Sequence, residues 1–134
     1  MRHLLKYVDL TRIDLIRDGH STLLHAAAFL GEPTMVQLLI DAGCNVEARN
    51  ESGCTPLMDA ADFGRTLSID PLLNANANID AIEINGRTAL HFAAKAAHHS
   101  FVQKLLRHNA NTTIQDKQGN TPLHLMIQPP IENV

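Results

Sequence analysis

The feature that most constrains this chain is a short string of residues that recurs at a fixed interval. Its four copies begin at Thr22, Thr55, Thr88 and Thr121, and each copy starts 33 residues after the one before. Three copies place a His three residues after the Thr, whereas the second copy has Met58 there. A period of roughly 20 to 50 residues is typical of solenoids, in which each unit packs against its neighbours and the core runs through the stack. We therefore predict a repeat protein.

Other positions keep the same period, and we call two positions in phase when a multiple of 33 residues separates them. Each Thr is expected to cap the start of a helix, because its hydroxyl can accept from an unpaired backbone N–H. Pro56 and Pro122 then occupy the first helical position, which needs no N–H. Alanine pairs follow, and these keep the helix thin: Ala27–Ala28, Ala60–Ala61 and Ala93–Ala94. The in-phase leucines are expected to point into the core: Leu24, Leu57, Leu90 and Leu123.

These residues and their period resemble the ankyrin repeat, whose unit is a β-turn followed by two antiparallel helices. The resemblance covers essentially the whole chain. It implies an all-α ankyrin-repeat solenoid of stacked helix–turn–helix units with projecting β-turns, and we call the two helices of a unit helix A and helix B. We divide the chain into a partial repeat 1–21, full repeats 22–54, 55–87 and 88–120, and a partial repeat 121–134. In the first partial repeat, the segment Leu4–Asp9 aligns with a helix B.

The second full repeat departs most from the pattern, because Pro71 is in phase with Leu38. A proline inside a helix costs about 3 kcal/mol. We predict instead a shortened helix B that starts late, with Asp70 as its N-cap and Pro71 in its first position.

The turn between the helices of the third full repeat is also unusual. Ala97 is in phase with Gly31 and Gly64. Either the turn differs there, or Ala97 is held in a strained left-handed conformation.

Both ends of the array lack an apparent polar cap, which solenoids need. Met126 and Ile127 are in phase with the alanine pairs, and Pro129–Pro130 is expected to end the last helix A. We interpret the ends as truncated or as covered by a partner.

Composition and charge argue against several functions. The 134 residues carry a net charge of −3, with no Trp and 4% aromatics, so we expect no binding to nucleic acid, which needs a basic face. No apolar segment approaches about 18 residues, so we expect no membrane insertion. Without an apparent signal peptide, we expect an intracellular protein of the cytoplasm, the nucleus or both, in which Cys44 and Cys54 are reduced.

The sequence gives little sign of catalysis. For His25, His91 and His124, the resemblance implies hydrogen bonds to the backbone of a neighbouring turn, and catalysis is the weaker alternative. A zinc site is also disfavoured, because no metal-binding spacing is present. Cys54 precedes a helix N-terminus, which could lower the pKa of its thiol, and we treat it as a surface residue. We predict no catalytic residue, no cofactor and no bound metal.

The resemblance also implies where a partner binds, namely the exposed side of helix A and the tips of the turns. The helix positions are Phe29, Leu30, Asp62, Phe63, Lys95 and Ala96. The turn positions are Glu51, Ser52, Cys54, Ile84, Asn85, Arg87, Lys117, Gln118 and Asn120. We expect Phe29 and Phe63 to contribute most to binding, although they could instead cover the next repeat.

Charge is uneven along the chain. Acidic residues outnumber Lys and Arg up to Glu83, whereas the stretch from Ile84 to Ile131 has five Lys or Arg residues against Asp116 alone. This is either chance variation or a dipolar surface that orients a partner.

The function that we predict is a non-catalytic protein–protein interaction module with a concave groove for a protein or peptide. One alternative is a regulatory or targeting segment of a larger multidomain enzyme, channel or transcription regulator. A stand-alone enzyme or metal protein is the other.

Overall fold

The computed structural model describes residues 22–127 of the chain, and every regular element in that part is helical. In chain order the helices are α2 (Leu23–Leu30), α3 (Pro33–Asp41), α4 (Pro56–Asp62), the 3₁₀ helix η3 (Thr66–Ser68), α5 (Ile69–Asn74), α6 (Ala89–Lys95), α7 (His99–Arg107) and α8 (Pro122–Ile127). The predicted helix at Leu4–Asp9 and the predicted stop at Pro129–Pro130 lie outside the described residues.

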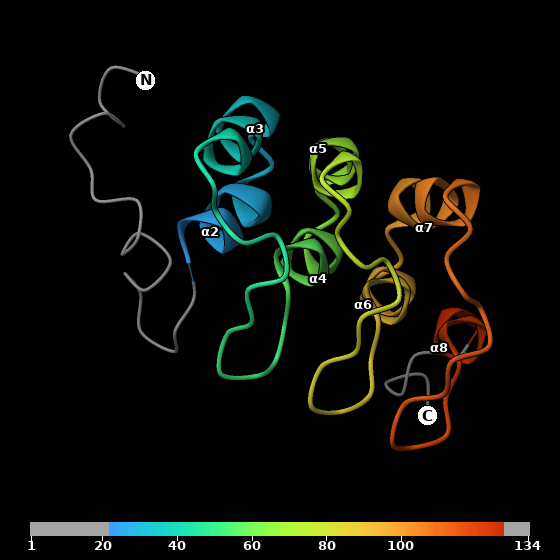
Figure 1. Cartoon of the computed structure of the whole chain (residues 1–134). Helices are drawn as coiled ribbons and strands as arrows, with labels where there is room; N and C mark the ends of the chain where they lie inside the picture. The colour runs from blue at the N-terminus through green and yellow to red at the C-terminus, as the bar shows by residue number, and fades with distance from the viewer. Residues whose placement is uncertain (1–21, 128–134) are drawn as a thin grey trace.

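The helices form two layers (Figure 1). Helices α2, α4, α6 and α8 stand side by side in one layer, and each packs against the next. Helices α3, α5 and α7 form the second layer, and long turns project beyond the first layer between successive repeats (Figure 1). The predicted all-α solenoid is confirmed, with α2, α4, α6 and α8 as the A helices.

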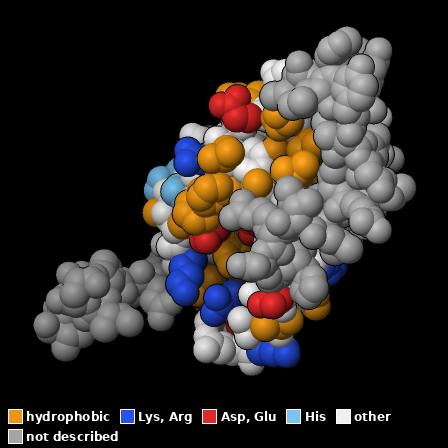
Figure 2. Space-filling view, turned by 90° about the vertical axis from the view of Figure 1, so that its left-hand side faces the viewer, with side chains coloured by type: hydrophobic (Ala, Val, Ile, Leu, Met, Phe, Trp, Pro, Cys, Tyr) orange, Lys and Arg blue, Asp and Glu red, His pale blue; other side chains and the backbone are white. Residues whose placement is uncertain are grey.

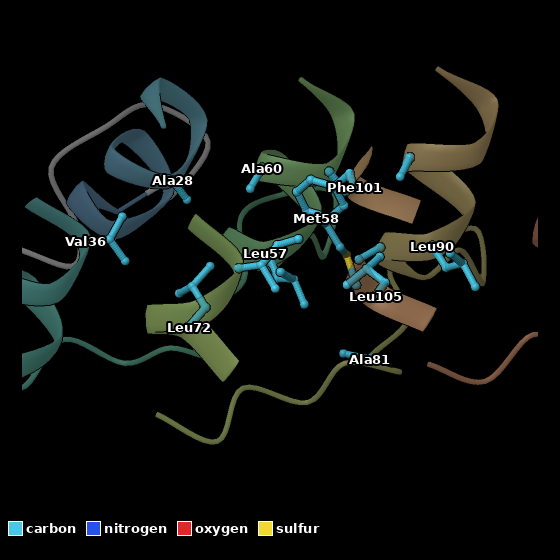
Figure 3. Packing of buried hydrophobic residues seen from close by; sticks show 14 of the residues in the cluster. Ala28, Val36, Leu57, Met58, Ala60, Leu72, Ala81, Leu90, Phe101 and Leu105 are labelled. Carbon is cyan, nitrogen blue, oxygen red and sulfur yellow. The ribbon is translucent and has the colours of Figure 1, made fainter. Parts of the chain in front are cut away.

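The core runs through the stack between the two layers. The alanine pairs of the three full repeats are 4% exposed or less, so the A helices can approach closely. Figure 3 shows Leu57 and Leu72 in one cluster with Val36, residues that come from three different helices. Leu24, Leu57 and Leu90 are buried as predicted.

The prediction for the fourth in-phase leucine is wrong, because Leu123 is 60% exposed. Within the described residues, α8 has no helix B packed over it, so the side of α8 that the other repeats cover faces solvent.

The predicted threonine caps are confirmed. The Thr22, Thr55 and Thr88 side chains accept from the backbone N–H three residues later. The Thr121 hydroxyl likewise accepts from the N–H of His124, at 3.4 Å. Pro56 and Pro122 begin their helices as predicted.

The prediction of a shortened helix B in the second repeat holds only for its α-helical part, because the 3₁₀ helix η3 runs directly into α5 and helical structure spans residues 66–74. The predicted starting point is wrong. α5 has six residues, whereas α3 and α7 have nine. It begins at Ile69, with Ser68 as its N-cap and Pro71 in its third position. A proline is tolerated there because first-turn N–H groups have no partner within the helix. The carboxylate of Asp70 does not cap the helix and instead pairs with Nζ of Lys104 in α7, at 2.8 Å.

The turns after the A helices are left-handed in all three full repeats. Gly31 has φ of 74°, Gly64 has 67° and Ala97 has 61°. Of the two alternatives for Ala97, the strained left-handed conformation is therefore the one present. Three in-phase residues that follow the B helices also have positive φ: Gly43, Asn76 and Asn109.

Candidate partner-binding surface

Two histidines of the repeated string bind the turn at the end of their own repeat. Nδ1 of His91 accepts from the backbone N–H of Thr88 at 3.0 Å, so Nε2 carries the proton, and Nε2 lies 2.8 Å from the carbonyl oxygen of Asn120. His25 makes the equivalent contact, with Nε2 at 2.7 Å from the carbonyl oxygen of Cys54. The structural interpretation of His25 and His91 is confirmed. Each ring holds the turn at the end of its repeat against the first helix of the same repeat.

The projecting turns are also joined to one another through the backbone. The carbonyl oxygen of Ser52 accepts from the N–H of Ile84 at 3.2 Å, and that of Asn85 accepts from the N–H of Lys117 at 2.9 Å. These four residues belong to the predicted binding surface. The hydrogen bonds hold their backbones in register, so their side chains project from a preformed edge.

Each turn is braced by a side chain that sequence reasoning missed. Oδ1 of Asn50 accepts from two backbone N–H groups of its own turn, and Oε1 of Glu83 and Oδ1 of Asp116 do the same one and two repeats later. The three residues are in phase. An Asn, Asp or Glu at a fixed turn position is the signal that could have identified them, since short polar side chains often bond the backbone two residues on.

Asp116 is charged although its side chain is buried. Burial raises the pKa of this carboxyl, but the backbone N–H groups of Asn120 and Gln118, together with the nearby His91 and Arg87, outweigh burial and hold the pKa below its ordinary value. The third turn is therefore braced by an anion.

Cys54 is a thiol of low reactivity, which corrects two predictions. It is half-buried and packs against the core, so it is not a surface residue. Burial and the negative charges of Asp59, Glu83 and Asp62 raise the pKa of its thiol to about 12. The net shift is upward, opposite to the predicted lowering by the helix N-terminus that follows, because desolvation and the carboxylates dominate.

An exposed aromatic pair lies where α2 and α4 end. The rings of Phe29 and Phe63 pack edge to face, with centroids 4.5 Å apart and an angle of 81° between their planes. Phe63 is nevertheless 47% exposed, and the neighbouring Leu30 is 60% exposed. Beside them lies an open hollow of about 320 Å³, which Leu30 and Leu67 line together. Phe63 thus contacts the preceding repeat and still offers an apolar surface.

The backbone beneath this pair is held by hydrogen bonds between repeats. Nε of Arg65 donates to the carbonyl oxygen of Phe29 at 2.9 Å. One repeat later, Nε2 of His98 lies 3.1 Å from the carbonyl oxygen of Asp62. The helix ends that carry the aromatic pair and Asp62 are therefore fixed before any partner binds.

Most of the predicted binding residues are exposed, and three have scaffold roles. The exposed residues are Leu30, Glu51, Ser52, Asp62, Phe63, Ile84, Asn85, Lys95, Ala96, Lys117 and Gln118. Cys54 and Asn120 are only half-exposed, and their carbonyl oxygens receive His25 and His91. Half-exposed Arg87 lies beside Asp116, with Nε and Oδ2 3.9 Å apart.

Viewed along the stack, the described surface carries a band of hydrophobic side chains, with Lys, Arg and His side chains along one margin (Figure 2). Such mixed surfaces suit protein contacts.

Residues 22–127 offer neither a metal site nor a membrane-spanning helix. No group of three or more His, Cys, Asp or Glu side chains in this range could hold a metal ion. None of the helices in the same range is long and apolar enough to cross a membrane.

The fold and surface define a helical repeat protein whose turns are held by hydrogen bonds and whose layer of A helices is exposed on one side. The family model for ankyrin repeats (3 copies) matches residues 1–83 and 66–129. The chain therefore belongs to the ankyrin-repeat family, whose members generally act as protein-interaction modules and typically have no catalytic activity. No curated protein matches the chain.

Proposed function

We propose that this chain binds a protein or peptide partner on the concave surface made by the exposed side of its A helices and the tips of its turns. The observation that carries the proposal is the Phe29–Phe63 pair, in which half-buried Phe29 supports the ring of Phe63 while Phe63 stays 47% exposed. A partner that covers the pair buries apolar surface without the entropic cost of ordering these side chains, because the two rings already pack against each other.

The size of this gain follows from the exposure of Phe63. About half of its roughly 200 Å² of surface remains exposed, which corresponds to about 2 kcal/mol at roughly 25 cal/mol per Å². Aromatic anchors of this kind often dominate an interface. Leu30 and the hollow that it shares with Leu67 extend the apolar area.

Charge along the surface sets the orientation of the partner. Exposed Glu51 and Asp62 lie toward the first repeats, and exposed Lys95 and Lys117 lie toward the last. We expect the partner to place basic groups near the first pair and acidic groups near the second, since complementary charge governs encounter and register. Raising the salt concentration should lower the association rate constant more than it changes the dissociation rate constant.

The test uses peptides selected from a displayed random library on the folded chain, with affinities measured by calorimetry. Phe63→Ala should weaken binding by at least about tenfold, as expected for loss of an aromatic anchor. Leu123→Ala is the control, because it removes an even more exposed apolar side chain, 60% against 47% for Phe63, from the far end of the stack and should leave affinity unchanged. Thermal unfolding verifies that both variants fold. Equal affinity of Phe63→Ala and the unsubstituted chain would overturn the proposal.

A further inference from the structure

The hollow beside the Phe29–Phe63 pair is lined partly by two residues that lie outside the predicted binding positions. They are Arg65 and Leu67, which follow the end of α4 in the chain. The full lining of this space of about 320 Å³ is Leu30, Gly31, Gly64, Arg65, Thr66 and Leu67. The hollow therefore joins the end of helix A in the first repeat to the turn between the helices of the second.

Two exposed leucines form the apolar sides of the hollow. Leu30 is 60% exposed and Leu67 is 64% exposed, and neither joins the hydrophobic core. The residues in phase with Leu67 are Thr34 and Ser100, so the repeat does not require a leucine at this position. Exposed apolar side chains that cluster, as these two do with Phe63, are typical of contact sites rather than of ordinary surface. The hollow thus offers an aliphatic group of a partner a place to be buried.

Arg65 adds a positioned positive charge to the same hollow. Its Nε donates to the carbonyl oxygen of Phe29 at 2.9 Å, and its aliphatic part lies along Gly31, where an added Cβ would be 3.0 Å from Cδ of Arg65. The first repeat therefore holds the guanidinium, although the residue is exposed. Within residues 22–127, neither Nη atom has a hydrogen-bond partner and no carboxylate pairs with the group. The edge formed by Nη1 and Nη2 is thus available to a carboxylate, which guanidinium groups often bind through two parallel hydrogen bonds.

The lining of the hollow selects the chemistry of its occupant. Among the described residues that line it, Arg65 alone is charged. The acidic residues Glu32 and Asp62 are close in the chain, but neither lines the hollow and neither pairs with Arg65. Phosphate-containing motifs are usually bound by clusters of arginines, whereas one guanidinium matches one carboxylate. The leucines on either side favour an aliphatic group next to that carboxylate.

We propose that the hollow binds a peptide segment of a partner protein in which an aliphatic side chain lies between Leu30 and Leu67 and a neighbouring Asp or Glu carboxylate accepts hydrogen bonds from Arg65. This inference rests on the function proposed above, because it describes what the partner places beside the Phe29–Phe63 pair. It goes beyond that function, because it adds Arg65 and Leu67 to the binding surface and specifies the chemistry of the bound segment.

The test uses the folded full chain and peptides selected on it from a displayed random library. The peptides are synthesised with amidated C-termini, so that a terminal carboxylate cannot contribute, and their affinities are measured by calorimetry. We expect the tightest peptides to share an Asp or Glu beside a Leu, Ile or Met. Binding should shift the methyl resonances of Leu30 and Leu67 in NMR spectra of the chain.

A double-mutant cycle measures the contact between the carboxylate and Arg65. Replacing the acidic residue of a selected peptide by its amide should weaken binding to the unsubstituted chain about tenfold, as expected for a hydrogen bond to a charged group. With Arg65→Gln the same replacement should change affinity by less than about twofold, since the coupling is lost. Lys117→Gln is the matched control, because it removes another exposed positive charge of the binding surface and should leave the effect of the amide intact. Should Arg65→Gln fail to fold, Arg65→Lys should still reduce this effect, because lysine lacks the forked donors.

A second pair of variants tests the apolar part of the hollow. Leu67→Ser should weaken binding at least about fivefold through the loss of apolar burial. Leu123→Ser is its control, because it removes a similarly exposed leucine, 60% against 64%, from the far end of the stack and should leave affinity unchanged. Thermal unfolding verifies that the variants fold.

Phe63→Ala separates failure of this inference from failure of the proposed function. An affinity that Phe63→Ala leaves unchanged would overturn both, as would a library that yields no binder. If Phe63→Ala weakens binding but the amide replacement in the peptide has the same effect with and without Arg65, this inference alone is overturned. It is also overturned if the resonances of Leu30 and Leu67 do not shift, or if a phosphoserine at the acidic position binds more tightly. Shifts that appear without peptide as the chain concentration rises would make a second copy the occupant and would overturn it too.

Discussion

The turn between helix A and helix B predicts two substitutions with opposite effects. Gly64 and Ala97 are in phase, and both have a left-handed backbone, with φ of 67° and 61°. A non-glycine residue in this region carries about 1 to 2 kcal/mol of strain. Replacing alanine by glycine also increases the conformational entropy of the unfolded chain, which lowers the stability of the fold by about 0.4 to 1 kcal/mol. Ala97→Gly should therefore stabilise the fold by about 0.5 to 1 kcal/mol.

Gly64→Ala should destabilise the fold by more than this amount. It introduces the same backbone strain, and the added Cβ would lie 2.8 Å from Cγ and Nδ1 of His98. The ring must then move, which endangers its hydrogen bond to the carbonyl oxygen of Asp62. Loss of a hydrogen bond of this kind adds about 1 kcal/mol. We expect a total loss of about 1.5 to 2 kcal/mol, because alanine also restricts the unfolded chain and so offsets part of the strain.

Urea unfolding followed by circular dichroism measures both effects, and a double-mutant cycle separates the two contributions. In a His98→Ala background, the effect of Gly64→Ala should fall to the backbone strain alone, since the ring is no longer in the way. The reasoning is refuted if Ala97→Gly lowers stability, or if the effect of Gly64→Ala is the same with and without His98.

Three further predictions concern single residues. The folded pKa of Asp116 lies below its ordinary value of 3.8, so the ionised carboxylate stabilises the fold above pH 3.8 and this stabilisation is lost as the pH falls through the folded pKa. The difference in unfolding free energy between the unsubstituted chain and Asp116→Asn should therefore shrink at acidic pH. A difference that does not change with pH would contradict this. Met58→His should add a hydrogen bond to the carbonyl oxygen of Arg87, equivalent to the bonds that His25 and His91 make at the in-phase positions. The fold should become more stable by about 1 kcal/mol, and an unchanged urea midpoint would exclude this added bond. With a thiol pKa of about 12, Cys54 should react with iodoacetamide at pH 8 far more slowly in the folded chain than in urea, as followed by mass spectrometry; equal rates would show that the thiol is accessible and ionisable.

Several failures of sequence reasoning have one physical cause. Asp70 was predicted as an N-cap from local preference, but it lies inside the first turn of α5 and pairs with Lys104 of the next repeat. The pKa of Cys54 was judged from the helix that follows, whereas burial and the carboxylates of the following repeat determine it. Leu123 was predicted to be buried from its position in the repeat, although burial requires a covering helix. In each case the deciding group belongs to another segment.

The sequence by itself determined the repeat and the local chemistry of each unit, including the threonine caps, the prolines that open helices and the left-handed residues that end them. These features depend on residues only a few positions apart, so they can be recognised in the sequence of each 33-residue repeat. Only the tertiary structure decided how surfaces meet between repeats. It brought the ring of Phe63 against Phe29, placed His98 over Gly64 and left Leu123 uncovered. Side-chain contact and burial are properties of stacked neighbours, which spacing along one chain does not specify.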